Sequence, residues 1–517
     1  MGNAKADLVL RNASVITLEP HHPSARTVYI RSGRILKVSG RDIDPASAGP
    51  GARVIDCAGK TVIPAFHDAH CHILGYAESL LNIDVSPTSV RSIEDIAGRI
   101  KEAAATLPAG SWIRCAGYNE FYLSEKRHPT RHDLDRATAA HPVKLTHRSG
   151  HAHVLNSLAL QLAGIGNESE EPPGGMIERN LETGEPSGLL YGMGTYLAQR
   201  IASAGDDELD AAMARAGRTL LSLGITIIQD ASPGNGMARW NRFIGWKRER
   251  LFAPRVVMMF GAGELASLQG RQPFYDKATG LGSGAVKIMI DEVKGSLNPP
   301  QEELNRLTAG IHRRRLQAAL HAVEETTVEA AVTALEYALQ ECPGRGHRHR
   351  LEHCSVCTPA MARRLARIAA GVVTNPAFIY YSGERYIAEV PPHQLKHLYA
   401  INTLLKTGVS VAAGSDAPVA SPDPLKGIYA AATRHTGTGQ TVTPGEAISV
   451  LDALKLYTIN AAYSCFREKQ TGSIAKGKWA DLVVLNGDPL QVSPHELKSL
   501  KVEMTVLEGE VVYSEAI

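Results

Sequence analysis

Cysteine is scarce in this sequence of 517 residues. The seven cysteines are few for this length and odd in number, which argues against a disulfide framework. Cys354 and Cys357 have the C-x-x-C spacing of half a zinc ribbon, but no second pair follows them. We therefore expect buried thiols at these two positions.

An excess of charge of either sign is also lacking. The 55 lysines and arginines nearly balance 53 aspartates and glutamates, and no long block of one sign stands out. Nucleic acids and anionic membranes are therefore poorly supported as partners. The first residues lack the apolar core of a signal peptide, and Ala6 stands where an N-myristoylation motif needs Ser or Thr. We expect a cytoplasmic protein with a small-molecule substrate; whether it forms a homo-oligomer stays open.

Apolar residues are plentiful, at 44% of the chain, and the length exceeds what one hydrophobic core usually supports. Both ends of the sequence consist of short β-rich runs separated by turns, at residues 8–10, 14–17, 27–30 and 54–56 and again at 481–485, 503–507 and 510–513. Neither end has enough strands for a sheet of its own. We therefore expect residues 1–63 and 466–517 to pair into one small β-sandwich.

Between the two ends, helical patterns alternate with short apolar runs, which is typical of parallel βα units. The amphipathic segments 359–370 and 397–407, for example, precede the apolar runs 372–374 and 409–413. Eight candidate strands can be counted, the number that a closed barrel needs, at residues 62–72, 225–230, 255–260, 285–290, 316–323, 348–354, 372–375 and 409–416.

The predicted fold is therefore α/β, a distorted TIM-like (β/α)8 barrel over residues 64–465 with the composite β-sandwich attached. The count requires residues of about 76–205 to be an insertion after the first strand, with strand-like runs of its own at 112–114 and 143–146. Insertions of this size usually cover or shape a site.

Candidate metal ligands stand at the C-terminal ends of these strands, where the chemistry of TIM barrels is built. His70 and His72 are separated by one residue, so on a strand both imidazoles point to the same face. The H-x-H pattern alone is weak, because it recurs at residues 151–153 and 347–349; its position at a strand end distinguishes the first pair. His321, His353 and Asp416 close later strands in the same manner.

Lys287 is unusual because it lies inside the apolar run 284–290. Burial lowers the pKa of an amine, and a neutral amine can react with carbon dioxide to give a carbamate, an anionic oxygen ligand that can bridge two metals. The alternative is an ion pair with Asp291 or Glu292 at the mouth of the barrel.

Four histidines, one aspartate and such an N6-carboxylysine form a nitrogen and oxygen ligand set suited to one or two Zn²⁺ ions. Manganese, cobalt and iron stay open as alternatives. Coordination to such an ion lowers the pKa of water to about 7 and so supplies a nucleophile at neutral pH. The ion would also polarise a carbonyl oxygen.

The motifs around these residues resemble the amidohydrolase superfamily, in particular the amidohydrolase family 3 branch that includes N-substituted formamide deformylases. The resemblance covers nearly the whole chain and rests on residues 66–72, 127–135, 172–177, 186–190, 350–353, 414–418 and 476–485. It implies a β-sandwich with a distorted barrel and a site built from His70, His72, Lys287, His321, His353 and Asp416. It further implies that Asp416 takes a proton from the attacking water and passes it to the leaving group.

Four further residues are candidates for substrate binding. The aromatic run 378–381 and the nearby Arg385 follow the seventh strand, at the active face of the barrel, and favour an apolar or aromatic substrate part. Tyr380, Tyr381 and Arg385 are therefore candidates, with core packing as the alternative for the rings. Glu292, near the end of the fourth strand, is the fourth candidate.

One catalytic candidate lies in the insertion. His151 belongs to the polar segment 147–153, which resembles a Gly-His motif of the same branch. It could polarise a substrate carbonyl, and a role at the surface is the alternative.

These features together predict a metal-dependent hydrolase that cleaves a carbon–nitrogen bond in an amide, formamide or carbamate. A deaminase or a cyclic amide or imide hydrolase on the same scaffold is the alternative, because a fold does not determine a function. A non-catalytic barrel is disfavoured because every expected ligand is present.

Overall fold

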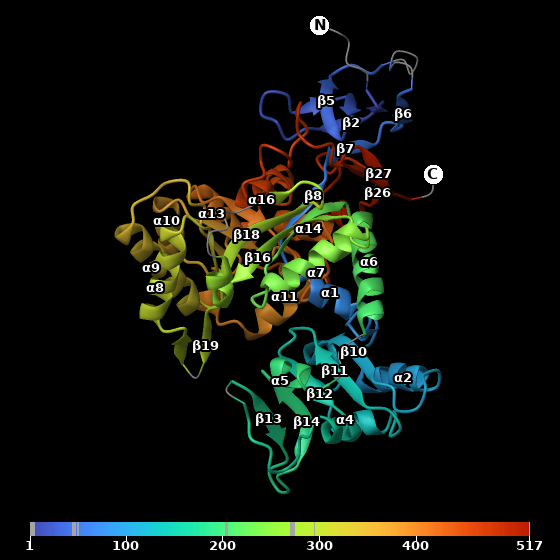
Figure 1. Cartoon of the computed structure of the whole chain (residues 1–517), viewed down its shortest axis with the longest axis vertical. Helices are drawn as coiled ribbons and strands as arrows, with labels where there is room; N and C mark the ends of the chain where they lie inside the picture. The colour runs from blue at the N-terminus through green and yellow to red at the C-terminus, as the bar shows by residue number, and fades with distance from the viewer. Residues whose placement is uncertain are drawn as a thin grey trace. The chain divides into compact units, whose positions relative to one another are not determined.

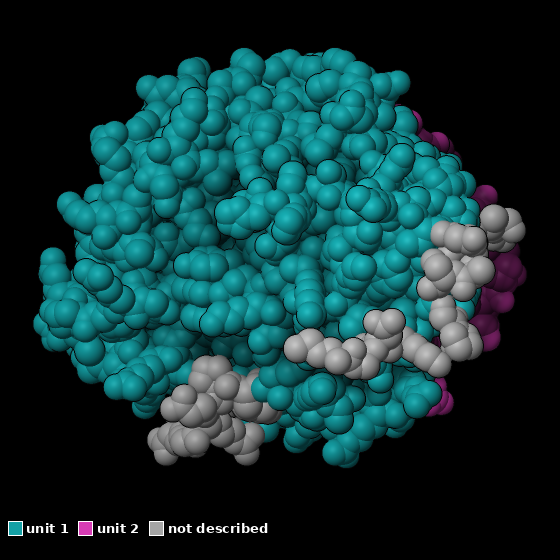
Figure 2. Space-filling model, turned by 90° about the horizontal axis from the view of Figure 1, so that it is seen from above, with its two compact units in different colours: residues 1–72, 217–517 teal, residues 73–216 magenta. Residues whose placement is uncertain are grey.

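The computed structural model describes residues 6–43, 48, 51–172, 174–201, 205–268, 275–293 and 295–515. The chain divides into two compact units, one of residues 1–72 and 217–517 and the other of residues 73–216, coloured teal and magenta in Figure 2. In the described ranges, none of the helices has the length and apolar character needed to cross a membrane.

The first unit contains a β-sandwich formed by both ends of the chain. One sheet has the order β5-β4-β1-β6 and the other the order β27-β26-β25-β7-β2-β3. The bounds are β1 Leu8–Arg11, β2 Ser14–Ile16, β3 Ser24–Ala25, β4 Thr27–Arg31, β5 Arg34–Ser39, β6 Arg53–Asp56, β7 Thr61–Pro64, β25 Leu482–Leu485, β26 Val502–Leu507 and β27 Glu510–Ser514. The two ends meet where β7 and β25 pair antiparallel, with Val62 opposite Val484.

The sandwich core consists of aliphatic side chains that alternate inward along strands of both sheets. Leu10 and Ile30 from one end of the chain pack in the same buried cluster as Leu482 and Val506 from the other. Each end thus buries an apolar face that it could not cover alone. The predicted composite sandwich is confirmed.

The barrel belongs to the same unit. Its strands run in the order β8-β15-β16-β18-β21-β22-β23-β24, and neighbours are parallel. The bounds are β8 Phe66–Cys71, β15 Ile225–Asp230, β16 Arg255–Gly261, β18 Leu281–Ile288, β21 Ala318–Ala322, β22 Arg350–His353, β23 Gly371–Thr374 and β24 Val411–Ala413. Asp416 N–H donates to His70 O at 2.8 Å and His72 N–H to Ala417 O at 2.8 Å, so β24 meets β8 and the barrel closes at this end. The predicted α/β barrel is confirmed.

The first barrel strand is shorter than the predicted run 62–72. Residues 61–64 form β7 of the sandwich, and the chain enters the barrel only at Phe66. Pro64 ends β7 because proline has no N–H to donate to a ladder. One apolar run therefore serves two sheets.

Helices follow the strands and surround the barrel (Figure 1). Their bounds are α7 Met237–Arg248, α8 Gln301–Arg313, α9 Glu325–Glu341, α10 Pro359–Arg367, α11 Ala377–Glu389, α12 Pro392–Leu395, α13 Ile401–Lys406, α14 Pro424–Thr433, α15 Val450–Leu456 and α16 Ile459–Ser464. α6 Asp206–Ser222, which precedes β15, spans the boundary between the two units. α10 shows why they start where they do, since Thr358 caps it by accepting from Met361 N–H and proline follows at the first helical position. A hairpin, β19 Asp291–Val293 with β20 Ser296–Asn298, follows β18. β17 Tyr275–Asp276 pairs with the start of β18.

The second unit is built on one mixed sheet of order β13-β14-β12-β11-β10-β9. Its elements are α1 Ile73–Ser79, β9 Ile83–Asp84, α2 Ile93–Ala104, β10 Ile113–Tyr118, α3 Arg131–Asp135, β11 Val143–His147, β12 Ala152–Leu155, α4 Ser157–Leu162, β13 Met176–Arg179, β14 Pro186–Tyr191 and α5 Gly194–Ala198. β10 and β11 include the predicted runs 112–114 and 143–146 in part or whole. The predicted insertion falls within the sequence range of this unit.

Candidate active site

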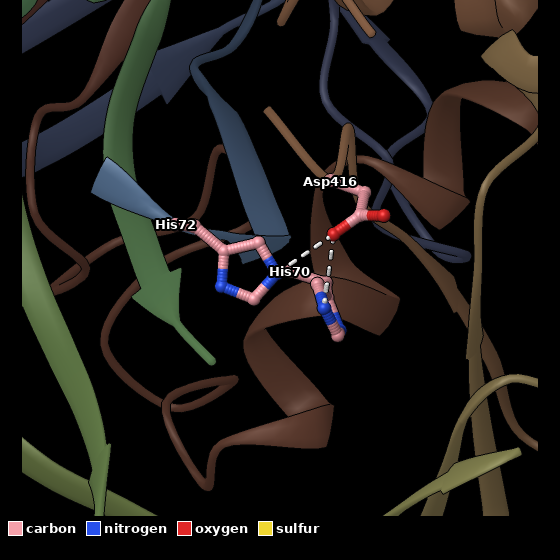
Figure 3. Close-up of side chains that lie close together, drawn as sticks. All are labelled: His70, His72 and Asp416. Carbon is pink, nitrogen blue, oxygen red and sulfur yellow. Dashed lines mark ion pairs between the residues drawn. The ribbon is translucent and has the colours of Figure 1, made fainter. Parts of the chain in front are cut away.

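His70, His72 and Asp416 come together where β8 and β24 end (Figure 3). Asp416 Oδ1 lies 3.3 Å from His70 Nε2 and 2.9 Å from His72 Nε2. His70 Nε2 and Asp416 Oδ1 are buried, yet neither has a hydrogen-bond partner of good geometry in the described structure. Since buried polar atoms are normally satisfied, two that face each other without a partner fit a cation bound between them.

The backbone of β24 is shaped to reach β8. A Cβ on Gly414 would lie 2.4 Å from His70 N, so only glycine permits this approach. Asp416 has a φ of 59°, in the left-handed region, which turns its side chain out of the strand direction. Asp68 holds this bend, because its carboxylate accepts Ser415 N–H at 2.9 Å and the Ser415 hydroxyl at 2.5 Å.

His353 and His321 join the same cluster from the ends of β22 and β21. The ring centroids of His70 and His353 are 4.6 Å apart, and those of His321 and His353 are 4.5 Å apart. Burial, foremost, lowers the pKa of His353 to about 3 and also lowers that of His321. Both rings are therefore neutral, as a metal-binding imidazole must be. The structure thus brings the four predicted histidines and Asp416 together.

Hydrogen bonds select which ring nitrogen is free. Asn375 Nδ2 donates to Gly414 O at 3.0 Å, so Asn375 Oδ1 faces His353 and accepts from its Nδ1–H at 2.7 Å. His70 Nδ1 is hydrogen-bonded to the carboxylate of Glu352. In both rings Nε2 is left to face the cluster, which is the arrangement by which second partners orient metal-binding histidines.

Glu352 is itself held by a buried network. Arg350 Nε donates to Glu352 Oε1 at 2.6 Å, and Arg350 Nη1 donates to Gln229 Oε1 at 2.6 Å. Burial alone would raise the pKa of Glu352, but Arg350, foremost, and His70 hold it well below its usual range. Glu352 is therefore a buried anion that accepts the Nδ1 proton of His70.

Lys287 on β18 points its amine into the interior of the barrel. Its Nζ is buried and has no hydrogen-bond partner in the described part of the chain. Burial lowers the pKa of Lys287 to about 8, although the charges of Glu352 and Asp416 oppose the shift. The alternative ion pair with Asp291 or Glu292 is not formed among these residues. An amine without a partner, next to two carboxylates, fits chemical conversion or direct contact with a bound group.

The model of the amidohydrolase family matches residues 53–513. The chain belongs to the amidohydrolase family. It is therefore an enzyme, a hydrolase that acts on carbon–nitrogen bonds.

Particular relatives agree with this assignment. The chain is 29% identical to an N-substituted formamide deformylase of Arthrobacter pascens, over 98% of both chains. Among solved structures, an uncharacterized metal-dependent hydrolase from Pyrococcus furiosus has a TM-score of 0.72 at 23% identity, over 94% of this chain and 100% of that one. Atrazine chlorohydrolase from Arthrobacter aurescens, complexed with zinc, has a TM-score of 0.56 at 14% identity, over 98% and 95%. At these identities the two structures show that the fold is shared.

In this amidohydrolase the predicted substrate-binding tyrosines lie on α11. Tyr380 and Tyr381 are half-buried and pack against an apolar cluster that includes Phe378 and Tyr399. Val419, which packs against the same cluster, donates its N–H to Asp416 O at 2.8 Å, so the cluster adjoins the candidate metal ligands. Packing is thus observed for both rings, and their role in substrate binding stays a prediction.

The other three candidates for substrate binding or catalysis are Arg385, Glu292 and His151. Arg385 Nε lies 2.6 Å from Glu389 Oε2, one turn along α11. Glu292, on the β19 hairpin, accepts from the Thr326 hydroxyl at 2.7 Å. Neither contact involves the histidine cluster. His151 is exposed between β11 and β12 of the second unit, and its catalytic role stays a prediction.

Several residues that position the site were missed at the sequence level. They are Asp68, Gln229, Glu352 and Asn375, all buried. The signal that could have found them is the one that identified Lys287, a polar residue within or directly after an otherwise apolar strand. The run Arg350 to His353 carries three such residues within four positions of a buried strand.

Proposed function

We propose that this protein is a metal-dependent hydrolase that uses a metal-activated water to cleave a carbon–nitrogen bond of a small substrate. The observation that carries the proposal is that the buried atoms His70 Nε2 and Asp416 Oδ1 face each other without a hydrogen bond of good geometry, with His72 Nε2 beside them. Amide, formamide and carbamate substrates are supported by the relative that is an N-substituted formamide deformylase. The apolar cluster beside Asp416 supports a partly apolar or aromatic substrate.

The donor set fits a divalent cation, and zinc best, because neutral imidazole and carboxylate are its usual ligands outside cysteine sites. His70, His72 and Asp416 would hold the first ion, and His321, His353 and Lys287 would complete the set. A divalent cation bound there supplies two effects: it lowers the pKa of water to about 7 and polarises the carbonyl oxygen.

Residues of the chain transfer the proton and orient the metal-binding histidines. The imidazoles around Asp416 hold its pKa well below its usual range despite burial, so Asp416 is ionised and accepts the proton of the attacking water. It passes this proton to the leaving nitrogen, so that the amine departs neutral. Glu352 and Asn375 keep the Nδ1 protons of His70 and His353 away from the centre.

Lys287 is proposed to carry a carbamate. Its neutral amine attacks the carbon of carbon dioxide, a C–N bond forms, and one N–H proton is released to water. The product is an anion with two oxygens, whereas an ammonium in the same place would repel cations. The low pKa of Lys287, about 8, makes the neutral amine available near neutral pH.

The function is tested by metal analysis of the purified protein combined with a substrate screen. We expect at least one tightly bound zinc per chain and turnover of an N-substituted formamide, amide or carbamate. His70→Ala should lose both metal and turnover, while His397→Ala, a half-buried histidine outside the cluster, should keep them. Activity restricted to cyclic imides or aminated heterocycles would support the alternative class instead. A metal-loaded protein with no turnover of any class would contradict the proposal.

The carbamate is tested by counting metals per chain in wild type and in Lys287→Ala. Two metals in the wild type, fewer in the variant, and recovery on adding a short-chain carboxylic acid are expected, because the added acid can replace the missing oxygens. One metal in both proteins, with a bare lysine in the crystallographic density, would refute the carbamate and leave a mononuclear hydrolase.

A further inference from the structure

The structure contains a second concave site, at the opposite end of the barrel from the histidine cluster. A cavity of about 880 Å³ is lined by loops that enter β21 and β22 and by the end of α16. These loops lead into the N-terminal ends of barrel strands, whereas His70, His353 and Asp416 lie at the C-terminal ends. A volume of this size is within the range of small-molecule pockets. The site is independent of the proposed hydrolysis.

The lining of this cavity is basic. Arg313, Arg315, Arg345 and Arg467 contribute to it, and no aspartate or glutamate does so among the described residues. Arg313, Arg315 and Arg345 are exposed and have no ion pair in the described ranges. The guanidinium of Arg467 lies over the ring of Tyr275, 4.1 Å from its centroid. Four arginines around one cavity without a carboxylate create a positive potential that attracts anions.

Some arginines of the chain are paired with acids: Arg364, on α10, contacts the carboxylates of Glu329 and Glu336, and Arg348 contacts that of Glu468. Other exposed arginines, such as Arg314 and Arg363, have no ion pair in the described ranges. What distinguishes the cavity is that four arginines line it and that no acid among the described residues does.

The two histidines that line the cavity, His312 and His347, already have hydrogen-bond partners. His312 Nε2–H donates to Cys342 O at 2.7 Å, so His312 Nδ1 accepts from His349 Nε2–H at 2.8 Å. His349 Nδ1 in turn accepts Ala318 N–H at 2.9 Å. His347 donates to Ile368 O at 3.0 Å. These contacts explain the H-x-H pattern at residues 347–349 as a structural one, and they leave the arginines as the charged donors for a ligand.

We propose that this basic cavity binds a phosphorylated small molecule. A guanidinium presents parallel N–H donors that match the oxygens of a phosphate group, and such charge-assisted bonds are stronger than neutral ones. α8 and α9, which lie side by side in Figure 1, end at this cavity and carry Arg313 and the loop of Arg345. The arginines would recognise the anionic phosphate oxygens, which free phosphate and a phosphate monoester have in common.

The proposal is tested by isothermal titration calorimetry of the full-length, metal-loaded protein with inorganic phosphate and with AMP. We expect saturable binding of one or both probes. Arg345→Ala and Arg315→Ala should each weaken it at least tenfold, since each removes charged hydrogen bonds. Arg314→Ala is the matched control, because Arg314 is exposed and adjacent in sequence but does not line the cavity. It should change the affinity by less than about twofold.

The results distinguish a site for free phosphate from a site for a phosphate ester, and some of them would overturn the proposal. Equal affinity for both probes identifies a site for the phosphate group itself, and tighter binding of AMP identifies a site for a phosphate ester. Absence of binding of either probe would overturn the proposal. Equal weakening of binding by Arg345→Ala and Arg314→Ala would also overturn it, because it would indicate unspecific attraction to positive charge. Binding that is unchanged in Arg345→Ala and Arg315→Ala would overturn it too, because the probe would then bind elsewhere, for example at the metal.

Discussion

The choice between the two ring nitrogens of a histidine decides what the candidate metal centre can hold. His70 Nδ1–H donates a hydrogen bond to Glu352 and His353 Nδ1–H donates one to Asn375, so Nε2 of each ring faces the centre. Neither partner is itself a member of the ligand cluster. Glu352 and Asn375, which are not ligands themselves, therefore determine which nitrogen of His70 and of His353 can bind a metal.

Glu352→Gln tests this control. The amide can no longer accept from both His70 and Arg350, so the His70 tautomer is not held and a buried guanidinium loses its charged partner. We expect metal affinity to fall on the order of 10- to 100-fold, measured by competition with a chromogenic chelator. Glu468→Gln, which only weakens the part-buried pair with Arg348, should leave affinity unchanged. Equal affinities in all three proteins would show that Glu352 does not orient His70.

Asp416→Asn tests the proton transfer. The amide keeps the size of the side chain but cannot accept the proton of the attacking water. Turnover should fall on the order of a hundredfold or more in enzyme whose metal content has been verified, while the circular dichroism spectrum is retained. Turnover near the wild-type rate would show that another group handles the proton.

Among the elements, the junction of β24 with β8 is the one on which the site depends. These strands lie more than 300 residues apart in the sequence and meet through two backbone hydrogen bonds at the ends that carry His70, His72 and Asp416. Gly414 permits the meeting, because its missing side chain leaves room for His70 N. Closure of the barrel and assembly of the site are thus one event.

Gly414→Ala should separate the two strands. The added methyl carbon would lie 2.4 Å from backbone, which cannot move away as a side chain can, and overpacking of this kind costs about 1–3 kcal/mol. We expect a lower melting temperature and weaker metal binding together, followed by differential scanning fluorimetry and metal analysis. Gly310→Ala, within α8 and facing open space, should keep or slightly raise the melting temperature. A Gly414→Ala protein with normal metal content would contradict the account.

For the whole molecule, the relevant fact is that all candidate ligands belong to one compact unit. His70, Lys287, His321, His353 and Asp416 lie in or shortly after five different strands of the unit formed by residues 1–72 and 217–517. Such a site exists only when the barrel is closed, so binding of a cation and folding of this unit are coupled.

Removal of the metal should therefore destabilise the protein. Free metal at one hundred times its dissociation constant stabilises a fold by about 2.7 kcal/mol, and dialysis against a chelator removes this contribution. We expect a lower melting temperature that zinc restores, measured by calorimetry. In a His70→Ala, His72→Ala double variant the chelator should change the melting temperature little. Identical melting with and without chelator in the wild type would argue against a resident cation.

The candidate metal ligands could be predicted from the sequence, but the residues that orient them could not. The barrel strands, the composite sandwich and the convergence of His70, His72, His321, His353 and Asp416 followed from apolar runs that end in polar residues. Glu352 and Asn375 could not be assigned in this way, because their partners His70 and His353 are chosen by strand register. Arg385 likewise turns to Glu389 on its own helix, a contact that no pattern distinguished from substrate binding.

The sequence by itself determined which residue types end which strands, because strand periodicity and apolar burial are local properties of the chain. It also determined the family, since the motifs keep their order along the whole length. Only the tertiary structure decided which nitrogen of His70 and of His353 is free, that Lys287 lacks an ion pair with Asp291 or Glu292, and that four arginines from three segments of the chain line one cavity. The physical reason is that these are contacts between residues far apart in the chain, and their distances are set by how the strands close into a barrel.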